Sequence, residues 1–157
     1  MVKNVFKKLG KKQKNNKGFS LVELIVVIAI MAVLVGVLAP QLIKYVEKSR
    51  EATDIQTCDN IATALKTYYA DEEVAASATA TTVTVTLGKT ELGTVADTAA
   101  DTAVKDAGLT KAKIKGTKWT GDKITIVYNK ADGTITYTGD SPYYHSDKDQ
   151  FKKGPKS

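Results

Sequence analysis

The sequence predicts an α+β fold in which a long, kinked N-terminal helix carries a small antiparallel sheet on its second half. Three observations predict this fold. A run without charge extends from Leu24 to Ala39, and apolar residues then recur at helical spacing as far as Tyr69. Short alternating segments with turn residues between them follow within residues 71–157. Because the second half of the helix is apolar on one face only, it needs a sheet to cover that face.

The long helix is predicted to run from about Phe19 to about Tyr69. Its first half, residues 19–43, is apolar on every side apart from Glu23, and its apolar stretch covers the length of about 20 residues that a bilayer requires. Its second half, residues 44–70, has apolar residues three or four positions apart from Ile55 onward, which is typical of an amphipathic helix. Pro40 is expected to kink the helix rather than end it, because membrane helices tolerate proline.

A strand and a short helix are predicted at the start of the globular domain. Val83, Val85 and Leu87 alternate with threonines, which indicates a strand. Alanines at helical spacing predict a helix over residues 94–107. Thr94 and Asp97 resemble a capping pair for it, and Gly108 is expected to end it.

Three further antiparallel strands are predicted near Ala112–Trp119, Asp122–Asn129 and Thr134–Thr138. Turn residues separate them at Thr120–Asp122 and at Asn129–Gly133, which ends in Asp-Gly. The last two strands are expected to pair as a hairpin. Alternate residues would form its buried face: Ile124, Ile126, Tyr128, Ile135 and Tyr137.

The net charge of +6 is concentrated at the N-terminus. Residues 1–18 contain seven lysines and no acidic residue, and the other 16 basic residues are balanced by 17 acidic ones. Once this leader is removed, no electrostatic case for nucleic-acid binding remains, so no nucleic-acid site is predicted. The lysines precede the apolar run, so the N-terminus is expected in the cytoplasm and the rest of the chain outside.

Three interpretations of the N-terminal segment compete. The first is a secretory signal peptide cleaved after Val37-Leu38-Ala39. The length of the apolar core and the position of Pro40 directly after that cut argue against it. The second is a plain membrane anchor. The third follows from a resemblance to a known family.

Residues 17–41 read KGFSLVELIVVIAIMAVLVGVLAPQ. This segment resembles the N-terminus of type IV prepilins and the related pseudopilins. The combination is specific: a basic leader ends in Gly18, an aromatic residue follows at Phe19, a carboxylate stands at Glu23, and Pro40 lies beyond an apolar helix. After about Tyr69 the resemblance is one of architecture only.

The resemblance implies a route from membrane to filament. A membrane-embedded prepilin peptidase would cut between Gly18 and Phe19 on the cytoplasmic side and methylate the new amine of Phe19. The helix would be kept, so the subunit would wait as a single-pass protein in the plasma membrane, in contact with lipid. An ATP-driven assembly platform would then draw it into a helical homopolymer, an extracellular pilus on the bacterial cell surface.

Glu23 allows two interpretations. A carboxylate at the centre of a membrane helix costs on the order of 3 kcal/mol, but near the N-terminus it costs less and the helix dipole favours it. Glu23 is then simply a tolerated acid in the first turn. Alternatively, it pairs with the Phe19 amine of a neighbouring subunit, since an unpaired charge in an apolar filament core is penalised. Pairing with the amine of its own chain is a further alternative.

Gly36 and Pro40 bracket a weak part of the helix. In the related family this stretch often loses helical structure on assembly. The resemblance therefore implies that residues 36–40 extend in the filament, and the alternative is a static kink.

The chain offers little material for catalysis. The single histidine, His145, is interpreted as a surface residue of the tail because no nucleophile–base pair can be nominated around it, and no glycine-rich phosphate loop or Cys/His metal spacing occurs. Cys58 falls on the apolar helix face and is expected to be buried. In the polar tail 139–157, aromatic residues can act as anchors: Tyr143, Tyr144 and Phe151. Weak calcium ligands there are Asp140, Asp147 and Asp149, although a solvated loop is the preferred interpretation.

The sequence thus predicts a structural subunit rather than an enzyme, with no cofactor. The leading hypothesis is the major pilin of a type IV pilus that serves adhesion, motility or DNA uptake. The first alternative is a pseudopilin of a type II secretion or competence machine. The second is a monomeric membrane-anchored binding domain, which would keep its leader.

Overall fold

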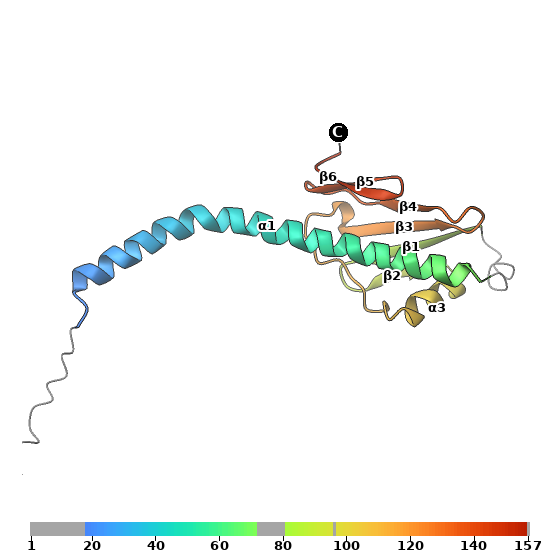
Figure 1. The fold of residues 1–157 in the computed structure, drawn as a ribbon, viewed down its shortest axis with the longest axis horizontal. Helices are drawn as coiled ribbons and strands as arrows, with labels where there is room; N and C mark the ends of the chain where they lie inside the picture. The colour runs from blue at the N-terminus through green and yellow to red at the C-terminus, as the bar shows by residue number, and fades with distance from the viewer. Residues whose placement is uncertain (1–17, 72–80, 96, 157) are drawn as a thin grey trace, which may run out of the picture. The chain divides into compact units, whose positions relative to one another are not determined.

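Helix α1 spans Leu21–Tyr69, with Pro40 inside it, and agrees with the long helix predicted from the sequence. The structure is a computed structural model (Figure 1), and the residues it describes are 18–71, 81–95 and 97–156. The chain divides into two compact units, Met1–Gln41 and Leu42–Ser157, and α1 contributes residues to both.

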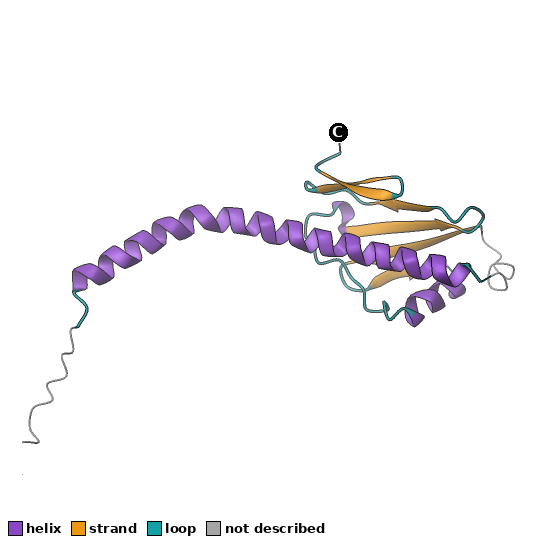
Figure 2. Ribbon diagram, viewed as in Figure 1, coloured by secondary structure: helices purple, strands orange, loops and turns teal. Residues whose placement is uncertain are grey.

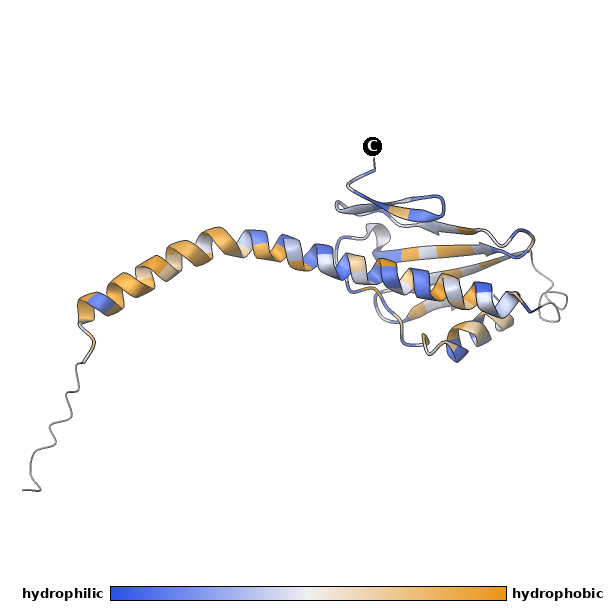
Figure 3. Ribbon diagram, viewed as in Figure 1, coloured by the Kyte–Doolittle hydropathy of each residue, from blue (hydrophilic) through white to orange (hydrophobic). Residues whose placement is uncertain are grey.

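The first unit contains the apolar part of α1. This part is long and apolar enough to cross a membrane, and its most hydrophobic stretch is not buried within the structure. Figure 3 shows it as an almost continuous hydrophobic stretch with one hydrophilic residue near its start. An apolar surface of this size is stable only when lipid or protein covers it.

The second unit is built on a four-stranded antiparallel sheet in the order β2-β1-β3-β4. The strands are β1 (Thr82–Gly88), β2 (Leu92–Val95), β3 (Lys123–Asn129) and β4 (Ile135–Thr138). The hairpin predicted from the sequence is confirmed in its register, with Ile126 opposite Tyr137 and Tyr128 opposite Ile135.

One face of this sheet packs on the second half of α1, and Figure 2 shows the helix lying along the strands. Residues of β1 and β3 are alternately buried and half-buried, because neighbouring side chains of a strand point to opposite faces. Val85 and Ile126 meet Ile61 and Leu65 of α1 in a fully buried core. Helix α3 (Thr98–Asp106) adds three small buried side chains, Ala100, Ala103 and Val104. The core therefore has the α+β arrangement that the sequence predicted.

Helix α3 begins four residues later than the helix predicted over residues 94–107. Its N-cap is Asp97, whose Oδ1 accepts the Ala99 N–H at 2.9 Å. Thr94, which was predicted to share the cap, belongs instead to β2. This four-residue strand was not predicted, because its single Gly93 and short length leave little alternation to recognise.

The predicted strand Ala112–Trp119 is wrong. The segment is a loop that ends in a short 3₁₀ helix, η2 (Thr120–Asp122). One backbone bond joins it to the sheet, from the Ile114 N–H to the Gly88 carbonyl at the end of β1, at 2.9 Å. Asp54 of α1 accepts the N–H of Lys115 and the N–H of Gly116, both at 2.7 Å, and the Trp119 indole N–H at 2.9 Å. A carboxylate of α1 thus accepts N–H groups that a neighbouring strand would accept if this segment were a strand.

The C-terminal tail forms a second, two-stranded sheet of β5 (Tyr144–Asp147) and β6 (Gln150–Lys153). Its Phe151 ring lies 5.7 Å from the Trp119 ring and 5.2 Å from the Tyr137 ring, measured between centroids. The Tyr137 N–H also donates to the Lys148 carbonyl at 2.8 Å. The anchoring role predicted for Phe151 is confirmed, but the hairpin was not predicted because charged residues mask its alternation.

Gly116 lies where the loop comes closest to α1. A Cβ added there would stand 2.7 Å from Glu51 Cγ, and 2.9 Å from both Asp54 Oδ2 and Trp119 Nε1. The Asp54 and Trp119 atoms are fixed by their hydrogen bonds and cannot move aside freely. The position therefore requires the absence of a side chain.

We expect Gly116→Ala to destabilise the globular unit by about 1–3 kcal/mol through overpacking. The loss is measured by thermal unfolding of the full-length chain in detergent, followed by the fluorescence of Trp119, the single tryptophan. Gly88→Ala is the matched control, because its Cβ would lie at an ordinary 3.4 Å from the Glu91 carbonyl oxygen. Equal melting temperatures for wild type and Gly116→Ala would contradict the close approach.

Candidate functional site

The segment Ser20–Glu23 starts α1 with a reciprocal capping box. Ser20 Oγ accepts the Val22 N–H at 3.3 Å, and Glu23 Oε2 accepts the Ser20 N–H at 3.0 Å. These bonds pair two of the amides that the start of a helix leaves open. Glu23 therefore stabilises the helix start within its own chain. This role was missed in the sequence, although the Ser-x-x-Glu spacing that indicates it is present.

Gly18 and Phe19 precede α1 and are open to solvent. The Phe19 side chain is 89% exposed. A Cβ added at Gly18 would meet no atom within 4 Å. The Phe19 ring has no partner within the described residues, and cleavage between Gly18 and Phe19 stays a prediction.

Exposed apolar side chains surround Glu23 along α1. Large hydrophobic residues from Leu21 to Val46 expose about half or more of their surface, and Glu23 is the only charged residue from Gly18 to Gln41. The site is thus an apolar helix surface with a single carboxylate in its first turn. Such a surface can bind a partner through apolar contacts, and its single charge can fix the position of that partner along the helix.

Gly36 and Pro40 both lie inside α1. A Cβ at Gly36 would meet nothing within 4 Å. Proline at position 40 has no N–H to give to the helix, so one backbone bond is missing there. The structure shows the helical form of this stretch, and its extension on assembly stays a prediction.

The aspartates considered for calcium are not gathered into one site. Asp147 pairs with Lys152, while Asp140 Oδ1 accepts the Ser146 N–H at 3.3 Å. Within the described part of the chain, no three His, Cys, Asp or Glu side chains are placed to hold a metal ion. His145 Nδ1 lies 2.9 Å from the Gly154 carbonyl oxygen, a contact that closes the end of the tail.

Cys58 is fully buried in the core, as the sequence predicted. Burial raises the pKa of its thiol, and the nearby Asp54 and Asp59 carboxylates raise it further. A thiol that stays protonated and out of reach is unreactive. Cys58 therefore acts as a small core residue.

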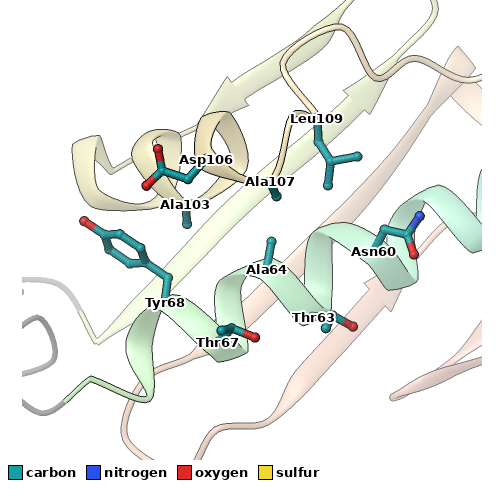
Figure 4. Close-up of a pocket in the computed structure, with 9 residues that line it drawn as sticks. All are labelled: Asn60, Thr63, Ala64, Thr67, Tyr68, Ala103, Asp106, Ala107 and Leu109. Carbon is teal, nitrogen blue, oxygen red and sulfur yellow. The ribbon is translucent and has the colours of Figure 1, made fainter.

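A groove of about 500 Å³ lies between α1 and α3 (Figure 4). Small side chains form its floor, with Ala64 on α1 facing Ala103 on α3 and Ala107 at the C-cap of α3. Tyr68 and Asp106 stand at its rim. The nine residues that line it include no histidine, cysteine or lysine.

Two further acids of α1, Glu47 and Glu51, are buried. Glu47 accepts the Thr117 N–H and lies 3.7 Å from the Arg50 guanidinium. Glu51 Oε2 accepts the Ser141 hydroxyl at 2.5 Å, whereas Glu51 Oε1 is buried without a hydrogen-bond partner. The signal missed in the sequence is that Glu47, Glu51 and Asp54 share the helix face of Cys58 and Ile61.

Comparison with known proteins identifies the class. Residues 13–39 match the prokaryotic N-terminal methylation motif. Prepilin peptidase-dependent protein A of Clostridium perfringens (strain 13 / Type A) is 33% identical over 100 residues, which cover 62% of this chain and 71% of that protein. No solved structure matches the chain.

The chain belongs to the type IV pilin and pseudopilin family. Members of this family are structural subunits rather than enzymes. The long apolar helix followed by a small antiparallel sheet domain is the pilin-like α+β arrangement that the resemblance implied. The apolar helix and the motif at its start are consistent with membrane anchoring.

The Glu51 carboxyl makes a pH-dependent contribution to stability. Burial raises its pKa above the ordinary 4.5, and the charges of Glu47 and Asp54 raise it further. Because the folded pKa is above the unfolded one, the associated stability is present below about pH 4.5 and is lost as the pH rises through the folded pKa.

We therefore expect Glu51→Gln to raise the melting temperature at pH 8 and to change it less as the pH falls toward 5. Glutamine keeps an acceptor for Ser141 and removes the buried charge. Glu47→Gln is the matched control and should lower stability at pH 8, since it weakens charge-assisted bonds to Thr117 and Arg50. Both are measured in full-length protein by Trp119 fluorescence. A Glu51→Gln variant less stable than wild type at pH 8 contradicts the assignment.

Proposed function

We propose that this chain is the major pilin of a type IV pilus and acts by polymerising. The observation that carries the proposal is the apolar surface of α1, which is exposed from Leu21 to Val46 and holds one carboxylate. Lipid covers such a surface while the subunit waits in the plasma membrane. In a filament, the same surfaces of many copies cover one another, and the globular units form the outside.

Processing precedes assembly in this proposal. The matched methylation motif and a relative whose name states dependence on prepilin peptidase support cleavage by that enzyme between Gly18 and Phe19. Cleavage removes the seven lysines of residues 1–18 and creates a positively charged amine on Phe19, which the enzyme then methylates. The lysines thus orient the subunit and are discarded, and the assembly platform receives the shortened chain.

Glu23 changes partners on assembly in the same proposal. Its carboxylate accepts the Ser20 N–H within the chain and has no cationic partner among the described residues. The amine of Phe19 on a neighbouring copy supplies that cation. In an apolar filament core, a register that leaves either charge unpaired is strongly disfavoured. Residues Gly36–Pro40 extend in the filament, since the missing proline bond and the glycine weaken the helix there.

The mature protein is expected to begin at N-methyl-Phe19, because the cut precedes the apolar helix and keeps it. Mass spectrometry of the protein isolated from cells tests this. A chain that starts after Ala39 contradicts the proposal in favour of a secretory signal. An intact leader of residues 1–18 contradicts it in favour of a monomeric membrane anchor.

Glu23→Gln separates the charge of Glu23 from its capping role, since glutamine also completes a capping box. If charge pairing fixes the register of neighbouring subunits, this variant should lower the amount of filament sheared from cells by at least about tenfold. The subunit should remain in the membrane. Ser20→Ala is the matched control, because it removes the serine cap but keeps the charge. Normal filaments from Glu23→Gln, seen by electron microscopy, would contradict charge pairing.

The amount and length of the filaments decide between the major pilin and the pseudopilin alternative. Abundant long filaments in which this chain is the main component support the major pilin. A trace component of a short fibre supports a pseudopilin of a secretion or competence machine.

A further inference from the structure

A small cationic pocket lies where α1 meets the C-terminal hairpin of the globular unit. Its volume is about 240 Å³, and its walls come from α1, from the loop before β5 and from the end of β6. The lining residues are Lys48, Pro142, Tyr143, Tyr144, Lys153 and Gly154. The lining therefore combines two exposed lysines with two half-buried tyrosines.

Neither lysine of this pocket is neutralised by an acid. Lys48 Nζ lies 5.4 Å from the centre of the Tyr143 ring, within cation–π distance. Lys153 stands opposite Tyr144 in the hairpin. Among the described residues no carboxylate pairs with either of them, whereas the neighbouring Lys152 pairs with Asp147. The pocket thus presents unpaired positive charge against aromatic surface.

The backbone of the pocket is held in place by buried hydrogen bonds. Ser141 Oγ donates to the buried Glu51 and accepts the N–H groups of Tyr143 and Tyr144, at 3.1 and 3.0 Å. On the far side, the Gly154 N–H donates to the Tyr143 carbonyl at 2.7 Å. The φ of +102° at Gly154 is one that side-chain-bearing residues rarely adopt. These hydrogen bonds therefore fix both walls of the pocket relative to α1, the helix that carries Lys48.

We propose that this pocket binds a sugar ring that bears a carboxylate or phosphate group. The two ammonium groups supply charge-assisted hydrogen bonds to the anion. The tyrosines supply flat apolar surface for the ring and hydroxyls for its polar edge. A volume of about 240 Å³ is below the range of about 300–1,000 Å³ typical of drug-sized ligands, which limits the occupant to about one ring.

A nucleic-acid strand is a poorer match for the same charges. Outside residues 1–18, the chain has 16 basic and 17 acidic residues, so no excess of positive charge exists to follow a long polyanion. A single acidic sugar, either free or as one unit of a polysaccharide, needs only the local charge of Lys48 and Lys153. The inference concerns the globular unit and does not depend on polymerisation.

The test is ligand binding to full-length protein in detergent by isothermal titration calorimetry. The probes are D-glucuronic acid and D-glucose 6-phosphate, with D-glucose and inorganic phosphate as the neutral and bare-anion controls. We expect saturable binding of both acidic sugars in the millimolar range, as is usual for one ring, and weaker binding of both controls. Binding should weaken further as salt is added.

Single substitutions locate the binding. Lys48→Gln and Lys153→Gln should each weaken binding of the acidic sugars at least about tenfold, since each removes a charge-assisted hydrogen bond. Lys48→Arg should retain binding. Lys152→Gln is the matched control and should change nothing, because Lys152 already pairs with Asp147. Trp119 fluorescence verifies that each variant is folded.

Four results would overturn the proposal. Equal binding of inorganic phosphate and glucose 6-phosphate would show a bare anion site without sugar recognition. Equal binding of glucose would show that charge is irrelevant. Unchanged affinity in folded Lys48→Gln and Lys153→Gln would place the ligand elsewhere. Tighter binding of a short single-stranded oligonucleotide, lost in Lys48→Gln and Lys153→Gln, would show that the pocket binds nucleic acid rather than a sugar.

Discussion

Three carboxylates of α1 hold the globular unit on its helix. Asp54 and Glu47 accept backbone N–H groups of residues 115–117, and Glu51 accepts the Ser141 hydroxyl. Buried acceptors are costly unless paired, so the loop has to point its amides at the helix. The close approach at Gly116 and the position of Trp119 follow from that requirement. The path of the tail over the helix depends on it as well, because Ser141 in turn fixes the start of the hairpin.

The carboxylate of Glu23 is in the opposite situation. It is exposed, and its one described partner is the Ser20 N–H in the first turn of the same helix. An exposed acid with a local bond can gain a cationic partner at little cost, whereas a buried acid with several bonds cannot change partners without loss of the fold. One helix therefore carries buried acids that attach the globular unit to it and one exposed acid that caps its first turn.

Local patterns predicted much of the fold and located the segment Gly18–Glu23, but not the capping bonds within it. The helix to Tyr69, strand β1 and the β3–β4 hairpin follow from spacing between near neighbours in the chain. The loop at residues 112–119 could not be predicted in this way, since Asp54 and Lys115 are 61 positions apart. Its alternating residues resemble a strand. In the fold, however, side chains of the helix opposite accept the N–H groups of residues 115–117.

By itself the sequence determined the apolar helix, the basic leader and the succession Gly18–Phe19–Glu23, because each depends on residues adjacent along the chain. Only the tertiary structure decided that Glu47, Glu51 and Asp54 are buried and that Lys48 faces Tyr143 across a pocket. The physical reason is that burial and pairing depend on which surfaces meet after packing. The spacing of residues shows which helix face an acid occupies. It does not show whether water or a loop amide becomes the partner of that acid.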